Sequence, residues 1–430
     1  MNPLRIILGW LDAQFPALRS RDYALLFTNS MFSAGANWAL LLGRGWLVFE
    51  ITGSSTAVGL VTFAGMAPFL FASPVAGALA DRIDRRRLAL IGVTIGLVGT
   101  IGLVLVTALG VVQVWHIVVL ALLGGVARAV QTPAEQAMLP NLVPPAHLLN
   151  AIALSNISQH GSRMAGPLIG GLLLTTLGPS AVFALSAGFF VASFAALWAI
   201  DYRSGRSEGV SVESLRRLGR EMADGVNYIG ADRRLALVVM LVVFHCALTM
   251  GFDSLMPQLA VDVGGGARGY SAILFGLGFG SVIGTLGIAR LRADGSEGRS
   301  LLVAGVGSAL AMFMLGTAQT QTTVLIGAIL AGATQASFMA LTASQAQALV
   351  RDDIRGRVMS IYVMLAAGHM AFLNLGFGAA EDIIGLRVLL IVPAAIWLVV
   401  LLGAIALLGD VRHLMWHGRF PAPSEVAVQP

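Results

Sequence analysis

The stretch GALADRIDRRR, residues 77–87, sets six charged side chains directly behind the uncharged segment 51–80. The composition of the whole sequence explains the contrast, because hydrophobic residues make up 57% of the 430 residues and charged residues only 11%. Such a composition is typical of proteins that lie within a membrane. Charged clusters of this kind then mark the loops between membrane-spanning segments.

About twelve apolar runs follow one another along the chain, and most are roughly 18 to 27 residues long, as a spanning helix requires. The runs are too long for barrel strands, and they lack the alternation of polarity that barrel strands show. The sequence therefore predicts an all-α integral membrane protein. The expected spans are 23–49, 56–80, 88–109, 115–138, 150–177, 180–200, 235–260, 270–290, 301–318, 323–348, 357–380 and 386–408.

The spans divide six and six around the longest polar stretch, residues 201–234. A weak internal repeat supports two halves, because QAMLPNLVPPAHLLNA (136–151) and QAQALVRDDIRGRVMS (345–360) occupy corresponding places. We expect an N-terminal segment 1–22, a bundle 23–200, a linker 201–234, a second bundle 235–408 and a tail 409–430. Apolar residues at helical spacing predict an amphipathic linker helix on the membrane surface: Leu215, Leu218, Met222, Val226 and Ile229.

The basic residues give the orientation, since the chain has 27 arginines and no lysine. With the N-terminus in the cytoplasm, 22 of these arginines are cytoplasmic, which the positive-inside rule favours. We therefore expect both termini in the cytoplasm. The net charge of +5 follows the loops, so it does not indicate nucleic-acid binding. No signal peptide is evident, and the first span serves as the insertion signal.

The opening stretch resembles the loop signature of the major facilitator superfamily between the second and third spans. The matching residues are Gly77, Leu79, Asp81, Arg82, Arg85 and Arg86, whereas Asp84 stands where the family usually has a second glycine. The resemblance implies a cytoplasmic gate, in which Asp81 pairs with arginines and with a helix N-terminus of the other half. Arg355 and Arg357 are the expected partners.

A second match lies in SRMAGPLIGG, which is similar to a stretch that the superfamily's antiporters carry. Ser162 replaces the first glycine, and the fitting residues are Gly166, Pro167, Gly170 and Gly171. Small residues and proline form either a pliable helix-packing seam or plain close packing.

Arg128 and Gln131 are similar to the family's R-x-x-Q, although Thr132 stands where glycine usually follows. With WLVFEITGSS and RGRVMSIY, the chain resembles the twelve-helix exporter branch that includes bacterial siderophore exporters. The resemblance implies a fold of two six-helix bundles related by pseudo-two-fold symmetry, in the inner membrane of a bacterium.

Polar residues inside spans are costly and usually face a partner or a watery cavity. Arg128 and Arg163 lie near the expected midplane without a carboxylate, so the cavity should favour an anionic group. The alternatives are arginines that tether backbone carbonyls and histidines that are merely packed. The expected cavity residues are Asn37, Arg128, Gln131, Gln159, His160, Arg163, His245, Gln335 and His369.

The energy source is expected to be an ion gradient, because a chain without lysine has no P-loop lysine for a nucleotide. Proton coupling needs a group that changes protonation, and the candidates are Asp253, His245 and Glu135, with Asp253 ranked first. His160 is a further candidate. We expect no cofactor and no metal site, and the single Cys246 offers no disulfide.

The sequence thus favours a proton-coupled antiporter that exports an amphipathic, anionic small molecule, such as a siderophore or related metabolite, by alternating access. Broad drug efflux is the rival within this class, and an anion importer is a further alternative. A membrane-embedded transferase would need a matched nucleophile and base, which the sequence does not display. We expect a monomer whose partners are the substrate, protons and the bilayer. We do not expect an enzyme.

Overall fold

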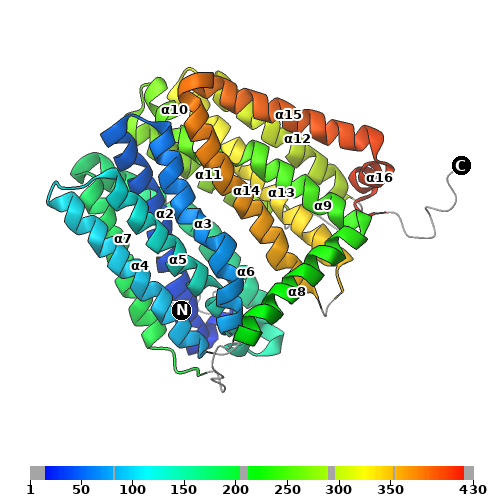
Figure 1. Cartoon of the computed structure of the whole chain (residues 1–430), viewed down its shortest axis with the longest axis horizontal. Helices are drawn as coiled ribbons and strands as arrows, with labels where there is room; N and C mark the ends of the chain where they lie inside the picture. The colour runs from blue at the N-terminus through cyan, green and yellow to red at the C-terminus, as the bar shows by residue number, and fades with distance from the viewer. Residues whose placement is uncertain (1–14, 81–82, 204–211, 289–295, 352–353, 421–430) are drawn as a thin grey trace, which may run out of the picture. The chain divides into compact units, whose positions relative to one another are not determined.

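The computed structural model describes residues 15–80, 83–203, 212–288, 296–351 and 354–420, and these form helices without any strand (Figure 1). The first part contains η1 (Pro16–Arg19), α2 (Arg21–Thr52), α3 (Ser55–Ala80), α4 (Arg85–Ala108), α5 (Val114–Met138), η2 (Leu139–Asn141), η3 (Pro145–His147), α6 (Leu148–Leu177) and α7 (Pro179–Trp198). The second part contains α8 (Val212–Ala231), α9 (Arg233–Thr249), η4 (Asp253–Leu255), α10 (Met256–Asp262), α11 (Gly266–Ile288), α12 (Ser296–Thr317), α13 (Gln321–Leu349), α14 (Arg355–Ile384), α15 (Leu386–Leu407) and α16 (Gly409–His417).

Local sequence signals set several helix boundaries. The Asp84 side chain accepts a hydrogen bond from the N–H of Arg87 and so caps the start of α4. Gly178 ends α6 with a positive φ of 81°, and Pro179 then begins α7. The residue that departs from the family's loop signature is therefore a helix cap, and it satisfies a backbone donor that a glycine would leave open.

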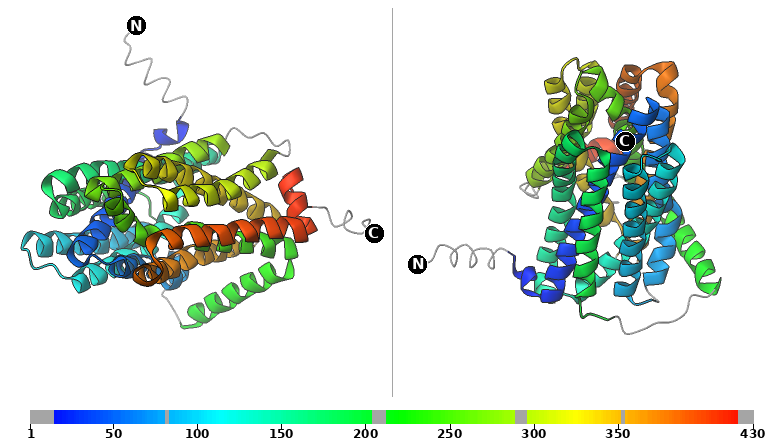
Figure 2. Two further views of the ribbon diagram at one scale, coloured as in Figure 1. Left: turned by 90° about the horizontal axis from the view of Figure 1, so that it is seen from above. Right: turned by 90° about the vertical axis from the view of Figure 1, so that its left-hand side faces the viewer.

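The chain divides into two compact units. The first comprises residues 1–47 and 64–218, and in it α4 packs against α5 and α7. The second comprises residues 48–63 and 219–430, and in it α13 packs against α11 and α12 while α12 also packs against α15. In Figure 2, α16 turns sharply away from the end of α15, so the predicted tail begins with a short helix.

The seventh predicted span, 235–260, lies within one apolar segment of 30 residues, Arg233–Asp262, but this segment is not one unbroken helix. The sequence suggested one continuous segment over 235–260, but α9 ends at Thr249 and is followed by η4 and α10. Pro257, in the first turn of α10, has no N–H to continue a longer helix. The side chain of Asn374 on α14 accepts a hydrogen bond from the freed N–H of Ser254 at 2.9 Å. Asp253 consequently lies in η4 and not on α9.

Nine segments within the described residues are long and apolar enough to cross a membrane, so the protein is a multi-pass membrane protein. Large apolar side chains face outward, and Leu407 for example is 85% exposed, as expected of a lipid-facing surface. Helices α2 and α6 are long enough to cross a membrane, with 32 and 30 residues, but they are not among these nine segments. Both carry polar residues that were singled out from the sequence. The count of twelve spans stays a prediction.

Candidate functional site

A buried carboxylate network lies within the first unit, and we call it the Glu135 cluster: Glu135 and Gln131 on α5, Asn29 and Ser30 on α2, and Ser193 on α7. Asn29 Nδ2 donates to Glu135 Oε1 at 2.6 Å, Ser30 Oγ donates to Oε2 at 3.1 Å, and Gln131 Nε2 also donates to Oε1. Ser193 Oγ donates to Asn29 Oδ1 at 2.6 Å and so fixes the orientation of that amide. Donors on α2 and α5 thus hold the carboxylate, and α7 orients one of them.

The donors around Glu135 are all neutral. Within the part of the chain that the structure describes, no arginine or histidine lies within 4.0 Å of its oxygens. A carboxylate in a helical bundle carries a large desolvation cost, which the amide and hydroxyl donors partly offset. Such a group can gain a proton without stranding a buried cation. Of this cluster, the sequence had indicated Gln131 by its similarity to the family pattern and Glu135 as a candidate for proton coupling, but not Ser30 and Ser193.

The two predicted cavity arginines lie in the same unit. The guanidinium of Arg163 on α6 lies 5.1 Å from the ring centroid of Trp38 on α2, which is a cation–π contact. Arg128 lies on α5, seven residues before Glu135 and therefore close to the same helical face. Asn37 Nδ2 donates to the carbonyl of Ser33 on its own helix. Gln159 is exposed and His160 is half-buried, both on α6.

His245 is packed in the core of the second unit. Its ring stacks on Phe338 with centroids 4.1 Å apart and meets Trp397 edge-on at 5.1 Å. Ser308 Oγ already donates to the carbonyl of Ala304, so it accepts from His245 Nε2 at 2.9 Å, and this assigns the neutral Nε2–H form. Nδ1 is buried without a hydrogen-bond partner. These contacts suit a packing role for His245.

The remaining predicted cavity residues of the second unit, Gln335 and His369, each contact a backbone carbonyl. Gln335 Nε2 donates to the carbonyl of Thr249, the last residue of α9. His369 is exposed, and its Nδ1 lies 2.7 Å from the carbonyl of Leu365 on the same helix. Asn374, which the sequence did not single out, is fully buried and binds the break between α9 and η4.

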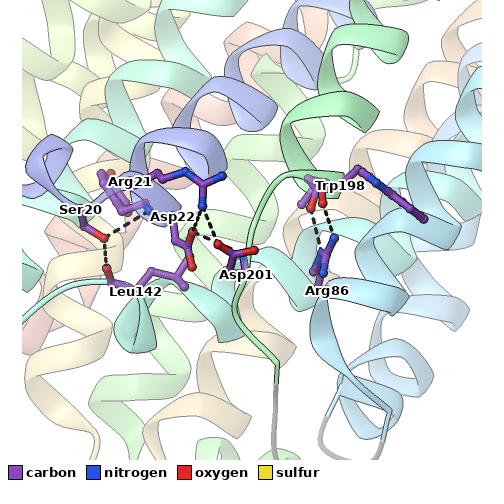
Figure 3. A network of polar contacts seen from close by, with 9 residues as sticks. Ser20, Arg21, Asp22, Arg86, Leu142, Trp198 and Asp201 are labelled. Carbon is purple, nitrogen blue, oxygen red and sulfur yellow. Dashed lines mark hydrogen bonds and ion pairs between the residues drawn. The ribbon is translucent and has the colours of Figure 1, made fainter.

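The arginines of the opening stretch bind helix ends within the first unit. Arg85 Nη1 donates to the carbonyl of Ala137 at 2.7 Å, near the C-terminus of α5. Arg86 donates to the carbonyls of Leu197 and Trp198 at the C-terminus of α7 (Figure 3). Cations at helix C-termini satisfy free carbonyls and complement the helix dipole.

The structure does not test the other residues of the predicted gate. Asp81 and Arg82 lie outside the described residues, and Gly77 lies in the last turn of α3. Arg355 Nη2 approaches the carbonyl of Val350 at 3.4 Å, and Arg357 lies in the first turn of α14. The gate stays a prediction.

A second polar cluster, also drawn in Figure 3, lies at the start of α2. Arg21 Nη1 lies 2.6 Å from an oxygen of Asp201, and Asp22 accepts a hydrogen bond from the N–H of Asp201. Ser20 Oγ donates to the carbonyl of Leu142 at 2.6 Å. These residues line an open surface hollow of about 390 Å³. Because the Arg21–Asp201 pair is exposed, it contributes little stability.

The predicted seam of α6 packs on α2. Ser162 Oγ donates to the carbonyl of Met31, and a methyl group at Gly166 would lie 2.7 Å from Cβ of Trp38. Gly170 faces Leu42 in the same way, and Pro167 and Gly171 are also buried. Small residues therefore allow α6 and α2 to approach closely.

The described residues hold no group of three or more His, Cys, Asp or Glu side chains that could bind a metal ion. Cys246 is buried, and its Sγ lies 3.4 Å from the sulfur of Met339.

The profile of a family described as "transmembrane secretion effector" matches residues 12–426. The staphyloferrin A transporter of Staphylococcus aureus is 30% identical over 168 residues, which are 39% of this chain and 42% of that protein. The multidrug efflux pump Tap of Mycolicibacterium fortuitum is 25% identical over 365 residues, which are 83% of this chain and 89% of that protein. The chain thus matches about two fifths of the first relative's length and most of the second's.

Solved transporter structures share the fold. A POT family transporter has a TM-score of 0.72 at 14% identity, covering 91% of this chain and 96% of that chain. The nucleoside transporter NupG has a TM-score of 0.70 at 12% identity, covering 90% of this chain and 100% of that chain. The human organic anion transporter MFSD10 has a TM-score of 0.62 at 15% identity, covering 88% and 97%. At these identities the likeness concerns the fold alone.

Proposed function

Because the chain belongs to the transmembrane secretion effector family, and so is a membrane transporter of the major facilitator type and not an enzyme, we propose that it is a proton-coupled antiporter. It exports an amphipathic, anionic small molecule across the inner membrane of a bacterium by alternating access. Both termini lie in the cytoplasm, and the protein works as a monomer.

The observation that carries this proposal is the Glu135 cluster. A proton carrier must change its charge within the transport cycle, and arginine does not do so. The Glu135 carboxylate is held by neutral donors on two helices, so proton uptake removes a costly charge and leaves no cation unpaired. We therefore rank Glu135 ahead of Asp253, which lies in η4 beyond the end of α9.

The substrate class rests on charge and on relatives. Arg128 and Arg163 belong to the same unit as Glu135, which supports an anionic substrate. A staphyloferrin A transporter among the relatives supports a siderophore or related metabolite. The second candidate is broad drug efflux, because the multidrug efflux pump Tap matches over 83% of this chain.

The first experiment identifies the substrate. Small molecules are profiled in the medium and cells of a bacterial host that makes the wild-type protein or Glu135→Gln, under iron-poor and iron-rich growth. A compound enriched outside only with the wild type supports export and supplies the substrate. A compound enriched inside would indicate an importer, whereas resistance to several drugs without a metabolite difference would favour drug efflux.

The second experiment tests coupling in energised everted vesicles. Substrate addition should dissipate the pH gradient, read with an acridine dye, in the wild type and in Glu50→Gln. Glu50 is an exposed carboxylate on α2, so it is the matched control. Glu135→Gln keeps the shape of the side chain but cannot ionise, and we expect at least a tenfold smaller response. A normal response of Glu135→Gln, with loss in Asp253→Asn, would move the coupling group to η4.

A further inference from the structure

Arg44 lies in the C-terminal part of α2, and its side chain reaches α5 within the first unit. Nη2 donates to the carbonyl of Leu120 at 3.4 Å, which is a long hydrogen bond. Nε is buried and has no hydrogen-bond partner. Nη1 also makes no hydrogen bond to a described residue, so most of the donors of this guanidinium are unused.

The backbone of α5 makes room for this guanidinium at Gly124. A Cβ atom at Gly124 would lie 3.2 Å from both Nη1 and Nη2 of Arg44, which is tighter than ordinary contact. Glycine at this position therefore lets the guanidinium lie directly against the helix. Arg128 follows Gly124 by about one turn on the same face of α5, so positive charge gathers along this stretch.

No carboxylate compensates Arg44 among the described residues. Its guanidinium has no ion pair within 4.0 Å. Glu135 lies 11 residues from Gly124 along α5, about 17 Å at the helical rise, and the Glu135 cluster already occupies it. Glu50 is on α2 but exposed, and six residues place it on another face of that helix. A fixed charge buried between apolar helices without a counter-ion calls for an anionic partner.

We propose that Arg44 is the anion-recognising residue of a ligand site between α2 and α5, and that it binds a carboxylate or another oxyanion group of the transported molecule. The planar guanidinium matches the two oxygens of such a group, and the unused Nε–H lies on the same edge as one of the two Nη2 hydrogens. Nη2 also donates to the carbonyl of Leu120, and the absence of a side chain at Gly124 lets the guanidinium lie against α5. This inference rests on the proposed export function and adds to it a residue that determines specificity.

The test uses two dyes with the same xanthene ring system, anionic fluorescein and cationic rhodamine 6G, in energised everted vesicles. The variants are Arg44→Gln, Arg44→Lys and, as the matched control, Arg268→Gln, which removes an exposed arginine. We expect Arg44→Gln to lower fluorescein transport at least tenfold, Arg44→Lys to restore part of it, and rhodamine 6G transport to stay unchanged. Gly124→Ala, which displaces the guanidinium but keeps its charge, should weaken fluorescein transport to an intermediate level.

Four results would overturn the inference. Fluorescein transport by Arg44→Gln at the wild-type rate would remove Arg44 from the site. Equal loss of both dyes, in protein that still elutes as one peak in size-exclusion chromatography, would mean that Arg44 only tethers α2 to α5. Wild-type transport of rhodamine 6G without fluorescein would reject the anion site and leave export standing. If the wild type carried neither dye, both the site and the proposed export would be rejected.

Discussion

Asp232 lies between the linker and α9, and its side chain caps the start of α9. Its carboxylate accepts hydrogen bonds from the N–H groups of Arg234 and Leu235 and from the Arg234 guanidinium. Partial burial acts to raise the pKa of Asp232, but these hydrogen bonds and the charge of Arg234 outweigh it and hold the pKa below its usual value. Asp232 is therefore an ionised N-cap, which also complements the helix dipole.

Replacing Asp232 with Ala should cost about 1 kcal/mol of folding stability near neutral pH, since an N-cap is lost. Because the folded-state pKa is depressed, the stabilisation is present above the unfolded value of about 4 and is lost as the pH falls through the folded value. The difference in melting temperature between wild type and Asp232→Ala in detergent should therefore shrink below about pH 4. Asp224→Asn, an exposed change on α8, is the control. A difference that stays constant with pH would contradict the ionised cap.

Side-chain partners were the least predictable feature at the residue scale. Hydropathy placed Glu135 inside a span, but two of its three donors, Asn29 and Ser30, come from α2, which is distant in the sequence. The same limit applies to His245. The sequence predicted that it lines a cavity, whereas in the structure it packs against aromatic side chains on two other helices. A sequence pattern orders residues around one helix only, whereas burial is decided by which helices pack together.

At the scale of elements, the contact between α11 and α13 is built on glycine. Gly276, Gly280 and Gly284 recur every four residues on α11, and a methyl group at Gly280 would overlap the carbonyl of Ile329 on α13. Gly332 on α13 lies equally close to the carbonyl of Leu277. The spacing was present in the sequence, but with 51 glycines in the chain it did not stand out.

Gly280→Ala should destabilise the second unit by about 1–3 kcal/mol, because two backbones must move apart. Gly287→Ala on the same helix meets no atom within 4 Å and should be neutral or stabilising by up to about 1 kcal/mol. Melting of the two variants in the same detergent measures the difference. Equal melting temperatures would show that α11 and α13 do not depend on this close approach.

Helix positions were predictable because run length and hydropathy act locally. The predicted span 115–138 and the observed α5, Val114–Met138, differ by one residue at one end. The break after α9 was not predicted because 235–260 was treated by hydropathy alone, although Gly251 and Pro257 lay inside it. Proline within an apolar run indicates a boundary only when its neighbours cannot supply the missing hydrogen bond, and α6 continues through Pro167.

At the scale of the whole molecule, the arginines carry two roles. Within the first unit, Arg85 and Arg86 bind the C-terminal carbonyls of α5 and α7, so part of the basic cluster holds helix ends together. The distribution of all 27 arginines also predicts the orientation of the chain. The two roles agree, because the helix ends that bind arginine are also the ends that the predicted orientation places in the cytoplasm.

The orientation can be tested by cysteine labelling, since Cys246 is the single cysteine and is buried. In a Cys246→Ala background, Val111→Cys lies in the exposed loop between α4 and α5, and Ala146→Cys lies between α5 and α6. A membrane-impermeant maleimide should label Val111→Cys in intact cells and Ala146→Cys only in everted vesicles. The reverse pattern would place the N-terminus outside the cytoplasm and would overturn the positive-inside interpretation.

The same labelling experiment also shows which side of the membrane is nearer to each of the two proposed sites along α5. Glu135 lies near the end of α5 that leads to Ala146, whereas Leu120 and Gly124, which hold Arg44, lie toward the end that begins after Val111. If Ala146 is cytoplasmic, Glu135 is nearer the cytoplasm and Arg44 nearer the outside. During export, an anion bound to Arg44 would then lie nearer the outside, where the substrate is released. Glu135 would exchange its proton nearer the cytoplasm. If Ala146 is labelled from outside, this order is reversed and the chain would have to import by the same scheme.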